Sequence, residues 1–197
     1  MVQRAVKWWL DRLVALLLLI LAAPLLGCLS MIMLARQGAP LLHRERRVGL
    51  GGREFALLKL RSMRIDAESA TGPVWTADGR DPRITALGRA LRLLHLDELP
   101  QLFNVLRGEM SLVGPRPERP EFVDQFSHKI NFYNERHRVL PGLTGWAQLC
   151  YQYGSSEDDA REKLQYDLYY VKNTSFFLDL IILLETVEVI LWGKGAR

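Results

Sequence analysis

The sequence lacks most of the features by which cofactor-binding enzymes and secreted proteins are recognised. Its 197 residues include only two cysteines, Cys28 and Cys150. Two cysteines are too few for a disulfide framework, so we expect both to be small, buried apolar side chains in a reducing compartment. There is no Walker phosphate loop and no dinucleotide-binding glycine fingerprint, and His128 and His137 are too isolated to suggest a zinc site. These absences argue against P-loop, dinucleotide-binding and zinc enzymes.

The composition indicates one basic domain with an attached membrane element. Hydrophobic residues make up 49% of the chain and charged residues 24%. A chain of 197 residues with this composition is long enough for one domain with a core, but not comfortably for two domains. The formal net charge is +4 and the isoelectric point is about 9.2. A basic chain favours partners that carry phosphate, an anionic membrane or nucleic acid, and charge alone does not distinguish among them.

The first forty residues predict the membrane element. Residues 13–34 carry no charge over a length that could just cross a bilayer as a helix. Lys7 and Arg12 precede this run and further basic residues follow it from Arg36, although positive charge normally stays on the cytoplasmic side. Pro24 lies near the middle and should bend the helix. We therefore expect residues 1–37 to form a re-entrant helix; an ordinary kinked spanning helix is the alternative.

Residues 38–197 are predicted to form a mostly helical domain with a small β-hairpin, which places the chain in the α/β class. Gly51 and Gly52 separate two apolar runs, as is typical of a hairpin turn. The second strand would carry Lys59 and Arg61 on one face. Helices are expected over 84–96, 97–107 and 120–134, and a loop with a helical turn over 66–81.

The C-terminal residues 175–192 are apolar, but Asp179, Glu185 and Glu188 interrupt the run every few residues. An interfacial amphipathic helix fits this pattern better than a membrane span. A core helix of the soluble domain fits it equally well.

Asp97 and Glu98 form the acidic pair with the most chemical interest, because they precede Pro100, a residue tolerated only in the first turn of a helix. Most such pairs only stabilise the start of a helix. The same position would also keep Asp97 ionised and exposed beside free backbone N–H groups, where a carboxylate could attack phosphorus. Glu98 supplies an oxygen ligand of the type that Mg²⁺ prefers.

Phosphoryl transfer also needs positive charge around the transferred group. The candidate phosphate-binding residues, each of which could equally be a solvated surface charge, are Lys59, Arg61, Arg92, Arg116 and Arg119. Arg116 is the strongest of them, because Pro115 and Pro117 hold its backbone rigid and lower the entropy lost on binding.

Four motifs in one order resemble those of the bacterial sugar transferases called monotopic polyprenyl-phosphate phosphoglycosyl transferases. They are residues 59–63 (KLRSM), 96–105 (LDELPQLFNV), 111–117 (SLVGPRP) and 141–148 (PGLTGWAQ). The match covers nearly the whole chain, and four long motifs make it highly specific.

The resemblance implies a ping-pong reaction on the cytoplasmic face of the bacterial inner membrane. Asp97 matches the nucleophile that attacks the β-phosphate of a UDP-sugar, releases UMP and holds the phospho-sugar until polyprenyl phosphate accepts it. Glu98 matches the acid that holds Mg²⁺. Lys59, Arg92 and Arg116 match basic positions around the phosphates. The implied partners are these substrates and membrane lipids but not nucleic acid, and a homodimer is allowed for.

The family's N-terminal helix is re-entrant and bends at a Ser-Pro pair, which favours the re-entrant form here, although this chain has Ala23-Pro24. Many members carry an arginine in the segment that matches residues 139–142 and an Asn-Gly-Arg stretch in the segment that matches residues 150–154. This chain has neither. The C-terminal part of the chain, from Tyr151 onward, is similar to an exopolysaccharide subgroup associated with exosortase systems. Its members often carry extra N-terminal membrane and Rossmann-like regions, so we expect a minimal form or a shortened chain.

Two other functions remain open at this stage. A non-catalytic basic membrane scaffold for polysaccharide assembly would use the same charges only to hold anionic lipid. Nucleic-acid binding is disfavoured, because the basic residues form no long cluster and a membrane anchor would be an odd addition.

Overall fold

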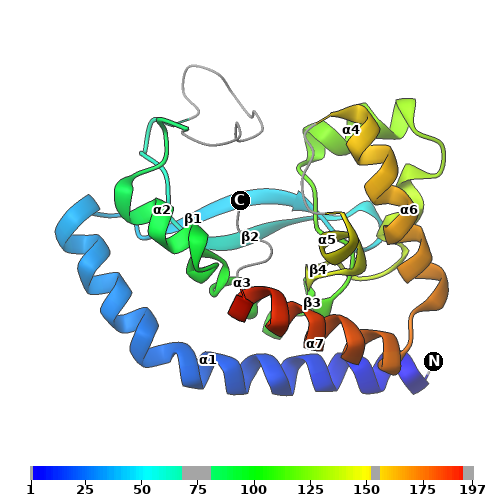
Figure 1. Cartoon of the computed structure of the whole chain (residues 1–197), viewed down its shortest axis with the longest axis horizontal. Helices are drawn as coiled ribbons and strands as arrows, with labels where there is room; N and C mark the ends of the chain where they lie inside the picture. The colour runs from blue at the N-terminus through cyan, green and yellow to red at the C-terminus, as the bar shows by residue number, and fades with distance from the viewer. Residues whose placement is uncertain (1, 68–80, 152–155, 193–197) are drawn as a thin grey trace.

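The computed structural model describes residues 2–67, 81–151 and 156–192, and within them the chain is mostly helical (Figure 1). The helices are α1 (Val2–Gln37), α2 (Ala86–Leu93), α3 (Gln101–Arg107), α4 (Pro120–Lys129), α5 (Trp146–Cys150), α6 (Glu157–Asn173) and α7 (Phe176–Trp192). The described strands form a two-stranded antiparallel sheet and a two-stranded parallel sheet. The expected α/β class, mostly helical with a small hairpin, is confirmed; the second sheet was not predicted.

Helix α1 is long, apolar and bent. It contains Pro24, and Figure 1 shows the helix running beneath the molecule and then turning upward beside α2. Proline removes one helical hydrogen bond and clashes with the preceding turn, so a bend is the expected consequence. The two arms pack into different apolar clusters, since Leu19 belongs to the main core and Met33 to a second cluster with Leu91.

Polar contacts hold both ends of α1 to the same domain. Near the start, Lys7 Nζ lies 2.7 Å from Asp179 Oδ2 on α7. Near the end, Gln37 Nε2 donates a hydrogen bond of 2.8 Å to Thr85 Oγ1, the N-cap of α2. The helix therefore lies along the domain over its whole length.

The predicted hairpin is confirmed. Strands β1 (Leu42–Val48) and β2 (Glu54–Leu60) pair antiparallel, with Glu45 opposite Leu57. A short 3-10 turn, η1 (Leu50–Gly52), joins them, and Gly51 and Gly52 have φ values of +64° and +78°. Both glycines are needed because other residues rarely adopt positive φ.

The parallel sheet pairs β3 (Ser111–Val113) with β4 (Gly142–Thr144). Its strands are too short to show a sequence period, which explains why they were not predicted. They approach closely at two glycines: a Cβ on Gly142 would lie 2.1 Å from the amide nitrogen of Gly114. This contact fixes the start of residues 114–117, which form neither helix nor strand.

Several predicted boundaries are wrong. The helix expected over 120–134 ends at Lys129, and a separate 3-10 segment, η3 (Tyr133–Arg138), follows it. The helix expected over 84–96 is the shorter α2, which begins at Ala86 and ends at Leu93. The loop expected over 66–81 lies mostly outside the described residues.

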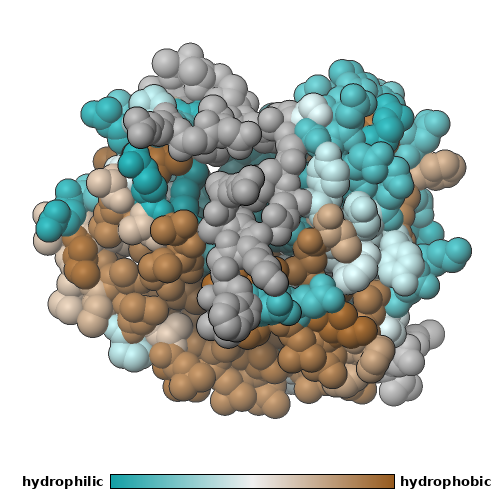
Figure 2. All heavy atoms as spheres, in the orientation of Figure 1, coloured by the Kyte–Doolittle hydropathy of each residue, from teal (hydrophilic) through white to brown (hydrophobic). Residues whose placement is uncertain are grey.

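The lower side of the molecule is an apolar surface, defined here as the exposed hydrophobic residues of α1 and α7. Figure 2 shows it as a brown band along the lower edge, with hydrophilic residues above it. Its members include Trp9, Leu13, Leu17, Ile20 and Leu21 on α1 and Phe176, Phe177, Leu184, Val187 and Ile190 on α7. Surfaces of this extent mark contact with a membrane or another protein.

Helix α7 has one face buried in the core, as a core helix would, and one exposed apolar face. Ile182 is fully buried in the main core, whereas Leu184 is 63% exposed on the apolar surface. The cysteine prediction is wrong, because Cys28 and Cys150 are both exposed. Cys28 lies on α1, and single exposed apolar side chains are common on protein surfaces.

Candidate active site

Asp97 lies in a short 3-10 turn, η2 (Leu96–Glu98), between α2 and α3. The single helix expected over 97–107 is therefore wrong at its start, since α3 begins at Gln101 with Pro100 as its N-cap. Proline has no N–H to donate, so the helical hydrogen-bond ladder does not continue back to Asp97. His95 enters the turn with a φ of +53°, which reverses the chain direction after α2.

Asp97 is buried rather than exposed, which corrects the prediction made from its place near a helix start. Only 7% of the residue is accessible to solvent. Burial raises the pKa of the Asp97 carboxyl above its ordinary value, and the neighbouring Glu98 raises it further, while Arg92 and Lys59 act in the opposite direction. Residues from three separate segments thus act on this one carboxyl group.

Glu98 is held by Arg116, one of the predicted phosphate-binding residues. Arg116 Nη2 donates a hydrogen bond of 2.6 Å to Glu98 Oε1. Burial alone would raise the pKa of Glu98, but Arg116, His95 and Lys59 together outweigh it and hold the pKa below its ordinary value. Pro115 and Pro117, on either side of Arg116, are buried, and the arginine itself remains exposed. Glu98 is therefore a carboxylate that stays ionised at neutral pH.

Lys59 belongs to a second charged cluster centred on Glu45, a residue that sequence reasoning missed. Glu45 Oε2 lies 2.8 Å from Lys59 Nζ and 3.0 Å from Arg47 Nη2, and Glu45 Oε1 accepts a hydrogen bond from Arg119. Burial would raise the pKa of Glu45, yet the three cations hold it far below its ordinary value. Glu45 is the single acid among the basic residues 44–47, and this pattern was the sequence signal that could have identified it.

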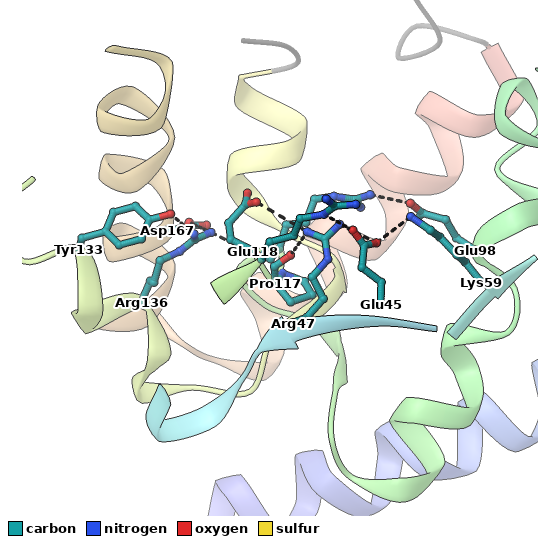
Figure 3. Close-up of polar contacts among 11 residues, drawn as sticks. Glu45, Arg47, Lys59, Glu98, Pro117, Glu118, Tyr133, Arg136 and Asp167 are labelled. Carbon is teal, nitrogen blue, oxygen red and sulfur yellow. Dashed lines mark hydrogen bonds and ion pairs between the residues drawn. The ribbon is translucent and has the colours of Figure 1, made fainter. Parts of the chain in front are cut away.

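The two clusters form one line of charged side chains. Figure 3 shows it running from Tyr133 and Arg136 at one end to Lys59 and Glu98 at the other. At the far end, Arg136 Nη2 pairs with Asp167 Oδ2 at 2.7 Å and donates to the carbonyl oxygen of Arg116 at 2.9 Å. Arg136 thereby connects α6 to the backbone of the arginine that contacts Glu98.

The remaining predicted bases have different surroundings. Arg92 donates from Nε to Ser62 Oγ at 2.8 Å and is close enough to lower the pKa of Asp97. Arg61 is buried, and its Nη2 donates to the carbonyl oxygens of Gln37 and Gly38 at the end of α1. Its Nη2 is thus occupied by the end of α1, so we assign Arg61 to holding that helix.

The structure thus brings Lys59, Arg92, Asp97, Glu98 and Arg116 into one electrostatic unit, in which each acid interacts with at least two of the bases. This arrangement concentrates positive charge around a carboxylate that water reaches poorly. Such a site is suited to binding phosphate groups and to placing a nucleophile beside phosphorus.

The comparison with known protein families agrees with this chemistry. The profile described as bacterial sugar transferase matches residues 2–193, which is nearly the full chain. The chain belongs to the bacterial sugar transferase family.

Curated relatives of this bacterial sugar transferase carry related names. A UDP-N-acetylgalactosamine-undecaprenyl-phosphate N-acetylgalactosaminephosphotransferase of Aeromonas hydrophila is 44% identical over 98% of this chain and 45% of its own length. UDP-glucose:undecaprenyl-phosphate glucose-1-phosphate transferases of Caulobacter vibrioides and Escherichia coli are 43% and 36% identical over 95% and 94% of this chain. The chain spans 70% and 40% of those two proteins, respectively.

Proposed function

We propose that this bacterial sugar transferase moves a sugar 1-phosphate from a UDP-sugar to polyprenyl phosphate and releases UMP. The reaction would be an early membrane step in the synthesis of an exopolysaccharide or another glycoconjugate. The named relatives act with undecaprenyl phosphate and with different sugars, which supports the acceptor class and leaves the sugar to experiment.

The observation that carries this proposal is the burial of Asp97 among cations. An acid that merely capped a helix would lie at the surface, but Asp97 is 7% exposed and interacts electrostatically with Arg92 and Lys59. A poorly hydrated carboxylate is a better nucleophile than one in bulk water, and the same cations would stabilise phosphate in the transition state.

The reaction proceeds in two displacements at one phosphorus atom. In the first, a carboxylate oxygen of Asp97 forms a bond to the β-phosphorus, and the bond from that phosphorus to the bridging oxygen breaks, with its electron pair leaving on UMP. In the second, an oxygen of polyprenyl phosphate attacks the same phosphorus and the bond to Asp97 breaks. The carboxylate is regenerated, and no net proton transfer is needed between dianionic phosphates.

The donor set fits Mg²⁺ held mainly by substrate. Within the described ranges, no group of three or more His, Cys, Asp or Glu side chains is placed to hold a metal ion. Mg²⁺ is commonly bound through one or two carboxylates, with substrate phosphates and water completing its shell. Glu98, kept ionised by Arg116, would hold it. When bound, the ion would neutralise charge that develops on the phosphate oxygens.

We place the enzyme on the cytoplasmic face of the inner membrane, with α1 entering and leaving on the same side. Both ends of α1 contact one domain, through Lys7 and Asp179 at the start and Gln37 and Thr85 at the end. A spanning helix would have to leave that domain behind at one end. Among the described residues, α1 is the one helix long and apolar enough to cross a membrane by length and composition.

The Asp97→Asn variant tests the proposed chemistry. Purified enzyme is mixed with a panel of UDP-sugars and Mg²⁺ without acceptor, and the protein mass and the released UMP are measured. The wild type should gain one phospho-sugar with one of the donors, and Asp97→Asn should gain none. Asp158→Asn, the same change at an exposed site on α6, is the matched control and should retain the adduct.

Two results would reject the proposal. A full adduct on Asp97→Asn would assign the nucleophile elsewhere. A wild-type protein that releases no UMP with any donor, Mg²⁺ and polyprenyl phosphate would favour the non-catalytic membrane scaffold.

A further inference from the structure

An apolar groove lies between the bent helix α1, the start of the hairpin and the start of α3. Its volume is about 900 Å³, in the range typical of ligand-binding pockets. One face of α1 forms the floor with residues at helical spacing, and the walls come from β1, its preceding segment, β2 and α3. The residues on which the inference depends are Ala23, Gly27, His43, Pro100 and Phe103.

The shape of the groove follows from small residues near the bend. Ala23 and Gly27 are one turn apart on either side of Pro24, and a Cβ on Gly27 would have no atom within 4 Å. A helix with large residues at these positions would fill the groove with its own side chains. Phe103 on the opposite wall is 46% exposed, so apolar surface faces the open space.

The groove borders the proposed active site at one end. Pro100, part of its lining, follows Glu98 by two residues. His43, also in the lining, pairs in register with Lys59 across the hairpin, and directly paired residues point to the same face of a sheet. Its other boundary is α1, whose outward side belongs to the apolar surface. The groove therefore connects the lipid-facing side of the molecule with the charged site.

We propose that this groove holds the isoprenoid units next to the phosphate of the lipid acceptor. The inference rests on the proposed function and specifies where the second substrate binds. A polar UDP-sugar would lose hydration in an apolar groove without recovering hydrogen bonds, which makes the donor a poor occupant. A phosphate attached to a hydrocarbon chain matches both ends: the chain fills the groove and the phosphate reaches the cations around Asp97.

Filling the groove should impair the second displacement and spare the first. In Gly27→Leu the added side chain enters open space, so the fold is expected to persist. With donor alone, this variant should form the phospho-sugar adduct at the wild-type rate. With farnesyl phosphate as acceptor, its KM should rise roughly tenfold or more, because small steric changes in apolar sites have effects of this order. Cys28→Leu, one residue away and outside the groove lining, should leave the KM unchanged.

A second measurement does not depend on catalysis. Gly27→Cys is prepared in a Cys28→Ser, Cys150→Ser background and treated with a maleimide in detergent. Farnesyl phosphate should slow the labelling of position 27, whereas UDP-sugar and a straight-chain alkyl phosphate should not. The wild-type Cys28, in a Cys150→Ser background, should label at the same rate with and without farnesyl phosphate.

The outcomes separate the two proposals. An unchanged KM in Gly27→Leu together with unprotected labelling would overturn the groove assignment. Equal protection by the straight-chain alkyl phosphate would show a general lipid contact. Loss of the donor adduct in Gly27→Leu would place the donor in the groove. Either result would also overturn the groove assignment. Protection by farnesyl phosphate in a protein that forms no adduct would support the groove while rejecting the proposed reaction.

Discussion

At the scale of single residues, the site depends on charged groups that compensate one another out of water. Glu45 accepts contacts from Lys59, Arg47 and Arg119, and removing its charge would leave three cations close together. Breaking a buried ion pair at one partner is costly because the other charge stays desolvated. Glu45 is therefore a stronger determinant of the site's stability than any exposed ion pair.

Glu45→Gln should lower the free energy of unfolding by about 3–5 kcal/mol. Glu54→Gln is the matched control on the same hairpin, since Glu54 pairs with Arg46 in an exposed contact at 3.2 Å. Such exposed pairs contribute about 0–1 kcal/mol. Denaturant titration of both variants in detergent compares them directly, and equal losses would show that the Glu45 cluster has no special weight.

His137 makes stability depend on pH. Burial, aided by the nearby Arg136, lowers the pKa of His137 from 6.5 to about 4. Below pH 6.5 the unfolded chain binds a proton at His137 that the folded chain does not. The contribution of His137 to stability is therefore fully present above pH 6.5 and is lost as the pH falls toward 4. The slope should reach at most about 1.4 kcal/mol per pH unit. Unfolding at pH 7 and pH 5 should show a smaller difference in His137→Gln; an equal difference would exclude this residue.

At the scale of elements, the bend in α1 determines what the helix can contact. Its two arms pack on different apolar clusters, represented by Leu19 and Met33, and a straight helix could not follow both. The break between η2 and α3 at Pro100 has a similar effect, because it turns Asp97 inward. In both cases a proline lacks the N–H that a helical hydrogen bond needs, and the chain changes direction there.

Pro24→Ala should straighten α1, because alanine favours an unbroken helix by about 3 kcal/mol over proline. Spin labels at positions 5 and 35, in a Cys28→Ser, Cys150→Ser background, should move apart relative to the same labels with Pro24 present. Activity should fall as the contacts of Met33 are lost. An unchanged distance would mean that packing, and not proline, sets the bend.

At the scale of the whole molecule, charge and hydrophobicity are separated onto different sides. The apolar surface of α1 and α7 lies along the lower side in Figure 2, with hydrophilic residues above it. This separation suits the proposed reaction, in which a water-soluble donor and a lipid acceptor would each approach from its own solvent.

Leu184→Glu should weaken the retention of the protein on membranes. Leu184 is 63% exposed on the apolar surface, and a carboxylate there would have to leave water on insertion. Flotation with vesicles at several salt concentrations measures the effect, and Gln165→Glu, an exposed position on α6, is the control. Equal retention of both variants would indicate that α7 does not contact lipid.

Much of the molecule follows from local sequence signals. The apolar run with Pro24, the Gly51-Gly52 turn and the rigid loop around Arg116 were predicted, because each depends on short-range chemistry that tertiary contacts reinforce. The acidic pair and three of the bases were identified from composition and motif, and the structure places them together. The orientation of Arg61 was not foreseen, because nothing local indicates that the end of α1 approaches its guanidinium.

The sequence by itself determined that the chain has a bent apolar helix and an acidic pair next to a proline, since these properties belong to neighbouring residues. Only the tertiary structure decided that Asp97 is buried, that Glu45 joins the charged site and that an apolar groove leads to it. These features arise where segments far apart in the chain meet. Burial and pKa depend on the combined surroundings of a group, so no local pattern could have predicted them.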